Sequence, residues 1–214
     1  EFSENHQLLT FCRSTDMGCH CGAEAASAAT LVCAWPSGAN SVKSSPMSNR
    51  LKDKWALVTG ASSGFGAETA RQLAAMGANL LLGARREDRL GQVAAECLER
   101  GAASAHIHKM DVTRTASVNK FADWAGATAG RVDVLINNAG GAHGVERVED
   151  GRDDDWEAMF QSNALGILRV TRAVLPLMKS HPGGIILNIG SIAGRVAYEG
   201  GSAYCASKAA ERSI

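Results

Sequence analysis

The sequence of 214 residues carries no net charge, because 22 lysine and arginine residues balance 22 aspartate and glutamate residues. A zero net charge implies no basic face with which the chain would wrap nucleic acid or sit on an anionic membrane. It also lacks any apolar run that approaches the roughly 20 residues needed to span a bilayer. We therefore expect neither nucleic acid nor a membrane as a partner.

Cysteine is scarce over most of the chain. Of the six cysteines, four lie near the start, namely Cys12, Cys19, Cys21 and Cys33. The segment Cys19-His20-Cys21 could be read as part of a metal or disulfide cluster, but zinc ligands are usually paired as C-x2-C or C-x4-C, so we expect no metal site. The later Cys97 and Cys205 are typical of reduced thiols, and we expect a cytoplasmic protein.

The first 50 residues have no clear periodicity and are interpreted as a flexible leader or a non-native extension. The apolar stretch over 29–35 leaves a targeting signal as an alternative, although no basic segment precedes it. Met47 could be a natural start, and we favour a leader, or translated vector or untranslated sequence, for residues 1–46. Residues 51–214 suffice for one globular α/β domain, since the chain is 45% hydrophobic and 21% charged.

From Leu51 onward, short apolar runs alternate with amphipathic stretches. The pattern predicts strands over 55–59, 79–82, 105–110, 132–137 and 184–189. It predicts helices over 68–76, 87–100, 116–127, 154–180 and 202–214. Alternation of this kind indicates a Rossmann-type, doubly wound parallel sheet in three αβα layers, covered on both faces and joined by right-handed crossovers.

A glycine-rich turn, TGASSGFG over 59–66, follows the first expected strand and opens a helix. Gly60 permits a tight turn, Gly64 lets backbone approach a pyrophosphate, and Gly66 lets the helix pack closely on the strand. The free N–H groups at the helix N-terminus suit phosphate. We therefore predict a dinucleotide site at Gly60, Ser62, Ser63, Gly64, Phe65 and Gly66, with a plain structural turn as the alternative.

The end of the second expected strand indicates which nicotinamide cofactor binds. Dinucleotide folds that prefer NAD place an acid there, which binds the ribose 2′-hydroxyl. This sequence has the neutral Ala84, followed by Arg85 and Arg86. A guanidinium can hold a 2′-phosphate with paired hydrogen bonds, so we predict NADP(H). The alternative is that the two arginines only cap the strand in solvent.

Tyr204 and Lys208 lie four residues apart on the last expected helix, so they point to the same face. A phenol ordinarily has a pKa of about 10, too high for efficient proton exchange at neutral pH. An adjacent ammonium, helped by the positive nicotinamide of an oxidised cofactor, stabilises a phenolate. The pair is therefore a candidate proton donor and acceptor, although Y-x-x-x-K also occurs by chance in helices.

The T-G-x-x-x-G-x-G spacing of the turn resembles the short-chain dehydrogenase/reductase family. Further motifs of that family recur in order from about Leu51 to the chain end, namely Asp111-Val112, the NNAG segment over 137–140, Asn163, Ser191 and Tyr204-x-x-x-Lys208. The 13-residue interval from Ser191 to Tyr204 is the usual one. Six ordered motifs are far more specific than any one of them.

The resemblance implies a role for each matching residue. Ser191 would hold the substrate carbonyl oxygen against Tyr204, while Lys208 would also bind the nicotinamide ribose. Asn163 would interrupt the long helix and hold a water that relays protons to the lysine. The remaining residues would contact the nucleotide, with the adenine flanked by Asp111 and Val112 and the ribose side lined by Asn138, Ala139 and Gly140. Each alone is also compatible with an ordinary turn or helix surface.

Three segments most resemble the NADP-dependent 3-hydroxy acid dehydrogenases that oxidise serine or allo-threonine, namely 64–66, 171–176 and 188–191. The resemblance implies an oxidoreductase that transfers a hydride between NADP(H) and a small carbonyl or hydroxy substrate, with the parent protein a dimer or tetramer. A 3-ketoacyl-thioester reductase is the alternative within the family.

Family members continue past the Tyr–Lys helix with two further strands and a substrate lid, whereas this sequence stops at Ile214. We therefore expect a C-terminally truncated domain that lacks the last strands of its sheet and much of its substrate pocket. A chain of this length should show little turnover. Two alternatives from other functional classes stay open. The chain could be a non-catalytic nucleotide-binding fragment, or a structural or partner-binding protein without a cofactor.

Overall fold

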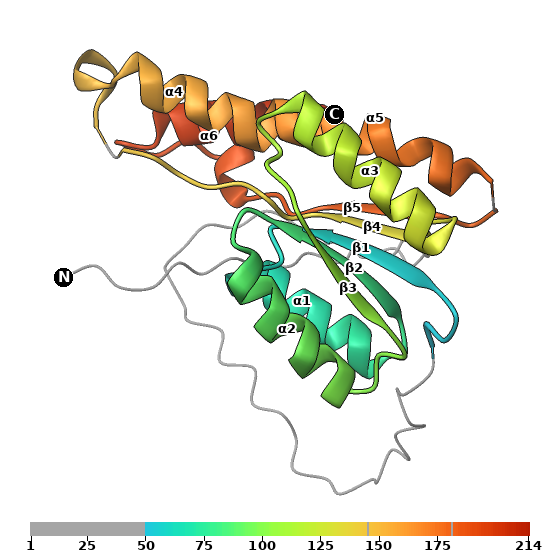
Figure 1. Ribbon diagram of the computed structural model, residues 1–214. Coiled ribbons are helices and arrows are strands. Elements are labelled where there is room, and N and C mark those ends of the chain that lie inside the picture. The colour runs from blue at the N-terminus through green and yellow to red at the C-terminus, as the bar shows by residue number, and fades with distance from the viewer. Residues whose placement is uncertain (1–49, 145, 181) are drawn as a thin grey trace, which may run out of the picture. The chain divides into compact units, whose positions relative to one another are not determined.

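A computed structural model describes residues 50–214 except 145 and 181 (Figure 1). The expected leader, apart from Arg50, and the four early cysteines lie outside the described residues. None of the described helices is both long and apolar enough to cross a membrane.

The described chain is built around one parallel sheet with the strand order β3-β2-β1-β4-β5. Its strands are β1 (Trp55–Thr59), β2 (Asn79–Ala84), β3 (Ala105–Lys109), β4 (Val134–Asn137) and β5 (Ile185–Asn188). The central strand β1 pairs with β2 on one side and with β4 on the other, so Leu57 stands beside both Leu81 and Leu135. The reversal of strand order at β1 and β4 is the topological switch point of a doubly wound fold.

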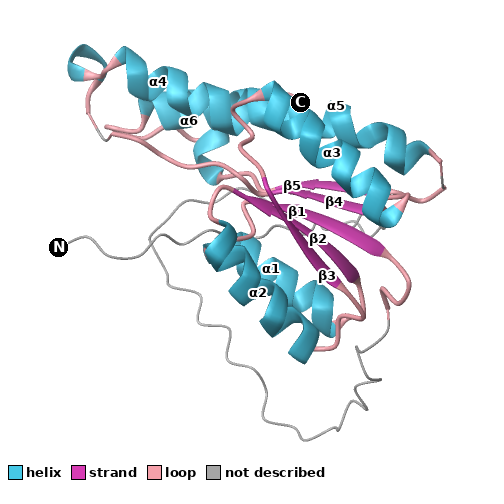
Figure 2. Cartoon of the chain, in the orientation of Figure 1, coloured by secondary structure: helices cyan, strands magenta, loops and turns pink. Residues whose placement is uncertain are grey.

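Helices cover both faces of this sheet, as Figures 1 and 2 show. One face carries α1 (Gly64–Ala75) and α2 (Glu87–Glu99). The other side carries α3 (Thr115–Ala129), α4 (Asp153–Met159), α5 (Leu165–Lys179) and α6 (Ser202–Arg212). Short 3-10 turns form η1 (Val148–Asp150) and η3 (Ile192–Gly194), and a π-helix forms η2 (Phe160–Ala164). The predicted three-layer Rossmann-type α/β fold is confirmed.

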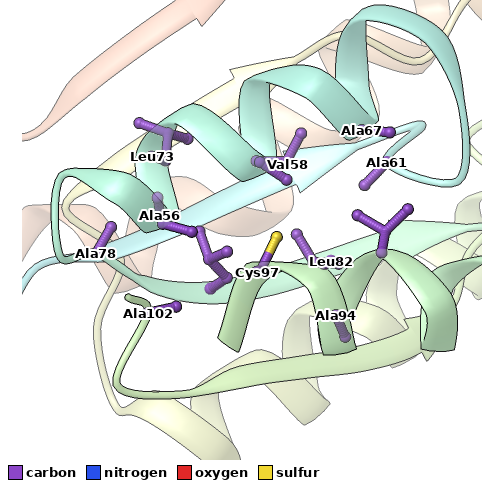
Figure 3. Close-up of a cluster of buried hydrophobic side chains, with 14 of the residues drawn as sticks. Ala56, Val58, Ala61, Ala67, Leu73, Ala78, Leu82, Ala94, Cys97 and Ala102 are labelled. Carbon is purple, nitrogen blue, oxygen red and sulfur yellow. The ribbon is translucent and has the colours of Figure 1, made fainter. Parts of the chain in front are cut away.

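Each layer of helices encloses its own apolar core, because successive side chains of a strand point to opposite faces. Val58 and Leu82 face α1 and α2, where they pack among many alanines and Cys97 (Figure 3). Leu57 and Leu81 face the other way and pack against α3 and α5. Burial raises the pKa of the Cys97 thiol to about 11, so this cysteine serves as an unreactive core residue.

Asp133, just before β4, ties the start of that strand to the start of β1. Its carboxylate accepts a hydrogen bond from the backbone N–H of Trp55 at 2.8 Å and lies within 3.3 Å of Lys54 and 3.2 Å of Arg131. Burial alone would raise the pKa of Asp133, but the bonds from Trp55 and Lys54 and the nearby Arg131 charge outweigh burial and lower it. The carboxylate is therefore stabilised in its charged form.

Two expectations about this fold need correction. The helix expected over 154–180 is not continuous, because the π-helix η2 separates α4 from α5. The apolar strand β5 is not covered on both faces: Ile185 is 59% exposed and Leu187 is 42% exposed. β5 is an edge strand of the described sheet and contacts chiefly β4, and no described helix packs closely on either of its faces.

Candidate active site

The candidate site lies where the parallel strands β1, β4 and β5 end. In a doubly wound sheet, the carboxyl ends of the strands around the switch point border a crevice that binds ligands. The turn after β1, the loop after β4 and the segment after β5 meet at this edge with the N-terminus of α1. The residues predicted to bind cofactor or substrate come from these segments, from the ends of β2 and β3, from η2 and from α6.

The glycine-rich turn has the backbone conformation that the sequence predicts. Gly60 and Gly64 have φ angles of +65° and +56°, in the left-handed region that favours glycine. A Cβ at Gly66 would come within 2.5 Å of the carbonyl oxygen of Gly60, so α1 can begin this close to β1 only with glycine there. A Cβ at Gly64 would meet nothing within 4 Å, which leaves open space in front of the first turn of α1.

Asn138 ties the loop after β4 to this turn. Its side-chain amide donates to the carbonyl oxygens of Thr59 at 2.9 Å and Gly60 at 3.3 Å. The Thr59 hydroxyl accepts hydrogen bonds from the backbone N–H groups of Asn138 and Ala139, both at 2.9 Å. The side chain of Asn138 is thus engaged in holding the two segments together, and the contact of Asn138, Ala139 and Gly140 with a nucleotide stays a prediction.

Arg86 reaches the glycine-rich turn from the end of β2. Its Nη2 donates to the hydroxyl oxygens of Ser62 at 3.1 Å and Ser63 at 2.7 Å. Ala84, where an acid would stand in an NAD-preferring site, is 6% exposed and neutral. Arg85 is exposed beside it, and Phe65 is 48% exposed at the start of α1. One guanidinium and two hydroxyls therefore converge at the position predicted for a 2′-phosphate.

Asp111 and Val112 shape the turn after β3. The carboxylate of Asp111 accepts hydrogen bonds from the Thr113 N–H at 3.0 Å and from its hydroxyl at 2.7 Å. Burial would raise the pKa of Asp111, but these bonds and the charges of Arg85 and Arg114 lower it instead. Val112 packs beneath Gly166, where a Cβ would come within 3.0 Å of it. Both residues hold the turn in place at the edge where adenine is predicted to bind.

The π-helix η2 presents Asn163 to the centre of the site. Within η2, the carbonyl oxygen of Gln161 accepts a hydrogen bond from Arg169 at 3.1 Å. This backbone group therefore has a partner although η2 interrupts the α-helical hydrogen bonding between α4 and α5. Asn163 is fully buried, and its amide nitrogen donates to the Gly141 carbonyl at 2.8 Å and to the Ser207 hydroxyl at 2.9 Å. Its Oδ1 accepts from the Gly141 N–H at 2.9 Å. This side chain joins the loop after β4 to α6.

The segment after β5, which carries Ser191, contacts Lys208 at two points. The Lys208 ammonium donates to the carbonyl oxygen of Ile189 at 2.9 Å. A Cβ at Gly194 would lie 2.6 Å from the Lys208 carbonyl oxygen, so η3 can touch α6 only through glycine. Ser191 lies between these two contacts and accepts a hydrogen bond from the Ala193 N–H at 3.2 Å. Tyr204, half-buried, lies one helical turn before Lys208 on α6.

A small cavity lies beside Tyr204, between the loop after β4, α4 and the start of α6. Its polar lining includes His143, Arg147, Arg152 and Asp155, and Trp156 contributes an apolar wall. Arg147 also donates to Glu199 at 2.7 Å, which links the loop after β4 to the loop before α6. The sequence alone assigned no role to His143 and only a packing role to Trp156, and the fold places both at this cavity.

Three residues of the site escaped prediction from the sequence. Thr59 and Ser207 each receive hydrogen bonds that hold the site together, and Glu211 contacts Lys208 at 2.6 Å. Ser207 and Glu211 each lie three residues after a predicted catalytic residue, on the same face of α6. That spacing was the available signal, but it does not distinguish a buried partner from a solvent-exposed helix residue.

Comparison with known proteins places the chain among dehydrogenases. A family model described as short chain dehydrogenase matches residues 54–214. An NADP-dependent 3-hydroxy acid dehydrogenase of Schizosaccharomyces pombe is 42% identical over 163 residues, which are 76% of this chain and 63% of the relative. The chain spans 60–66% of the length of this and two other curated relatives.

Two solved structures are similar in fold as well as in sequence. An alcohol dehydrogenase from the archaeon Thermococcus sibiricus, complexed with 5-hydroxy-NADP, has a TM-score of 0.72 and 34% identity over 75% of this chain and 67% of its own. Serine dehydrogenase from Escherichia coli has a TM-score of 0.68 and 36% identity over 74% of this chain and 72% of its own.

Proposed function

The chain belongs to the short-chain dehydrogenase family, and we propose that the complete protein transfers a hydride between NADP(H) and a carbonyl or secondary alcohol. The observation that carries this proposal is that the segment with Ser191 packs on α6 at Lys208. Ile189 and Gly194, which flank Ser191 in the sequence, both contact Lys208, and Tyr204 lies one helical turn before that lysine. Residues 51–214 are proposed as the NADP-binding domain of that protein.

The residues around the glycine-rich turn fit NADP(H). The open space at Gly64 and the N-terminus of α1 suit a pyrophosphate. Arg86, with the Ser62 and Ser63 hydroxyls, suits a 2′-phosphate, and Arg85 adds positive charge nearby. The neutral Ala84 would not repel that phosphate. The NADP-dependent relative and the complex with 5-hydroxy-NADP support the same assignment.

The chain's own residues would position the substrate and move one proton. The nicotinamide, when bound, supplies or accepts the hydride. Ser191 would donate a hydrogen bond to the substrate oxygen and hold it near Tyr204. The Tyr204 hydroxyl would give its proton to that oxygen in reduction and take it back in oxidation. The Lys208 ammonium would stabilise the phenolate and bind the nicotinamide ribose.

Asn163 would act by holding these groups in place. All of its polar side-chain atoms already bind protein groups, so a water that relays protons to Lys208 would be held by a neighbouring backbone carbonyl. The amide would fix the position of that backbone through Gly141 and Ser207. Holding two reacting groups in a fixed geometry contributes a large part of the rate acceleration of a reaction between them.

A small 3-hydroxy acid is the proposed substrate class. The 3-hydroxy acid dehydrogenase and serine dehydrogenase relatives support it, and both names denote substrates with a carboxylate and a nearby hydroxyl. The lining of the cavity beside Tyr204 contains Arg147 and Arg152 together with the acids Glu146 and Asp155, so a substrate carboxylate would have to replace an acid as partner of one of the arginines. A carboxylate bound there would leave the hydroxyl carbon close to Tyr204.

Two further proposals concern the setting of the enzyme. The buried free thiols of Cys97 and Cys205 are compatible with a reducing compartment, and we propose that the protein is cytoplasmic. We also propose a homo-oligomer, as is usual for this family; the exposed Leu165 on α5 is compatible with a contact between copies.

The test is NADPH oxidation by the complete protein with a panel of small β-keto acids and aldehydes. We expect the Tyr204→Phe variant to lose roughly 10²–10⁴-fold in kcat while it still enhances NADPH fluorescence on binding. Tyr198→Phe is the matched control, since Tyr198 is the chain's other tyrosine and is 53% exposed. Retention of turnover by Tyr204→Phe would refute the role of the phenol, and a wild-type protein that turns over no carbonyl would refute the function.

A further inference from the structure

A buried acid contacts the lysine of the proposed catalytic pair. Glu211 lies three residues after Lys208 on α6, and its Oε2 accepts a hydrogen bond from the Lys208 ammonium at 2.6 Å. The Glu211 side chain is 2% exposed and that of Lys208 is 10% exposed. Two of the three N–H bonds of the ammonium are thus directed at protein oxygens, one at Glu211 and one at Ile189.

Stability gives no reason for an acid at this position. The second carboxylate oxygen of Glu211 is buried and has no hydrogen-bond partner among the described residues. Such an atom costs free energy, and a buried ion pair can often be replaced by apolar side chains with no loss of stability. Burial raises the pKa of Glu211, and the Lys208 ammonium offsets part of that rise. A hydrophobic side chain would fill the same space without these costs.

Among the charged groups of the described residues, Lys208 is the one that contacts Glu211 directly, and its charge lowers the pKa of Glu211 against the effect of burial. α6 packs against α4, η2 and η3. The segments η2 and η3 contain no titratable side chain, whereas α4 carries the acids Asp153, Asp154, Asp155 and Glu157. α6 itself also carries Tyr204, Cys205 and Arg212. None of these side chains forms a hydrogen bond or salt bridge with Glu211, whose partner among the described residues is Lys208.

We propose that Glu211 is a positioning residue, which holds the Lys208 ammonium between its own carboxylate and the Ile189 carbonyl and sets the pH at which Tyr204 exchanges its proton. The inference rests on the proposed function, since it concerns the same Tyr–Lys pair. The carboxylate offsets part of the positive field that Lys208 exerts on the phenol. The phenolate therefore forms at a higher pH than it would beside an unpaired ammonium.

The direction of the effect follows from the sign of the charge. Removal of the negative charge at Glu211 leaves the ammonium field at Tyr204 uncompensated, so proton loss by the phenol becomes easier. Alcohol oxidation requires the Tyr204 phenolate as proton acceptor. In the variant, kcat/KM for alcohol oxidation should therefore reach half of its maximum at a lower pH. For the loss of one unit charge in a partly buried site, we expect a shift of about one pH unit.

The experiment compares the pH profile of alcohol oxidation by the complete protein with those of its Glu211→Gln and Glu211→Met variants. Glutamine keeps an oxygen acceptor for Lys208 without the charge, and methionine removes both polar atoms at similar volume. Glu157→Gln, an exposed acid on the neighbouring helix α4, is the matched control. Thermal unfolding of each variant is measured in parallel.

The expected result is a midpoint about one pH unit lower in both Glu211 variants, an unmoved midpoint in Glu157→Gln, and a melting temperature of Glu211→Met at or above that of the wild type. Superimposable profiles, or a large drop in melting temperature with an unmoved midpoint, would overturn the inference and leave the proposed function standing. A wild-type protein that oxidises no alcohol would instead overturn the proposed function, and this inference with it.

Discussion

Replacement of Asn163 by alanine tests whether one buried amide holds the candidate site together. The side chain is fully buried in the π-helix η2 and forms three hydrogen bonds of 2.8–2.9 Å, two with the backbone of Gly141 and one with Ser207. It therefore joins the loop after β4, the break between α4 and α5, and the helix that carries Tyr204. Alanine removes all three links at once.

The structure gives the size of the effect. Ser207 is fully buried, so its hydroxyl loses a partner that water cannot readily replace, at a cost of about 1–3 kcal/mol. Gly141 is exposed, so water can take over its two bonds, and their loss costs about 0.5–1.5 kcal/mol each. The total is about 4 kcal/mol, in the middle of a range of about 2–6 kcal/mol. For a domain of this size, that corresponds to a fall of roughly 8–16 °C in melting temperature.

The assay is thermal unfolding of the complete protein, followed by circular dichroism, together with kcat for carbonyl reduction. We expect kcat to fall by at least about tenfold, because Tyr204 and Lys208 lie on the helix that Asn163 anchors. Asn119→Ala makes the same chemical change at an exposed position of α3 and should alter neither quantity. A melting temperature for Asn163→Ala within about 2 °C of the wild type would refute the reasoning.

The sheet and the nucleotide turn could be predicted because their signals are local. The continuous apolar run over 55–59 predicts a buried strand, and β1 spans Trp55–Thr59. The glycines of the turn predict left-handed backbone at Gly60 and Gly64, which the structure has. Strand–helix alternation then fixes the parallel sheet, since parallel neighbours need a crossover. The ends of the other elements differ from expectation by a few residues at most, apart from the long helix.

The interruption of that helix could not be located from its periodicity. The apolar spacing over 154–180 continues through the break, and the π-helix at Phe160–Ala164 depends on partners distant in the sequence. Asn163 binds Gly141 and Ser207, which are 22 and 44 residues away. The family resemblance did imply an asparagine that interrupts the helix at this position. The sequence pattern alone treats Asn163 as a surface amide.

Burial and side-chain direction were the other properties that sequence did not supply. Glu211 would be assigned to solvent by its residue type, yet it is 2% exposed on a helix that packs against α4, η2 and η3. The apolar β5 would be assigned to the core, yet it is exposed at the sheet edge. The hydrogen bonds of the Asn138 amide to Thr59 and Gly60 were likewise not predicted, and its expected place beside a nucleotide stays a prediction. In each case the presence or lack of long-range packing contacts determines the outcome.

Two further perturbations test the charges of the fold. Arg86→Ala should raise KM for NADPH by about 10-fold or more, since a charged hydrogen bond contributes about 1.5–3 kcal/mol, and should leave KM for NADH nearly unchanged. A larger increase in KM for NADPH from Arg85→Ala would show that Arg85 is the phosphate ligand instead. Asp133→Asn should lower the melting temperature at pH 7, because the Asp133 carboxylate binds Trp55, Lys54 and Arg131. Burial opposes the charged form, but these partners outweigh it and depress the pKa of Asp133 in the folded protein. The stabilisation is therefore present above the unfolded pKa of about 4 and is lost as the pH falls through the lower folded value. The difference in melting temperature between wild type and Asp133→Asn should therefore shrink as the pH falls from 5 to about 2. A difference of constant size over that range would show that the charge of Asp133 is not the source of the stabilisation, since the asparagine oxygen can still accept the hydrogen bond from the Trp55 N–H.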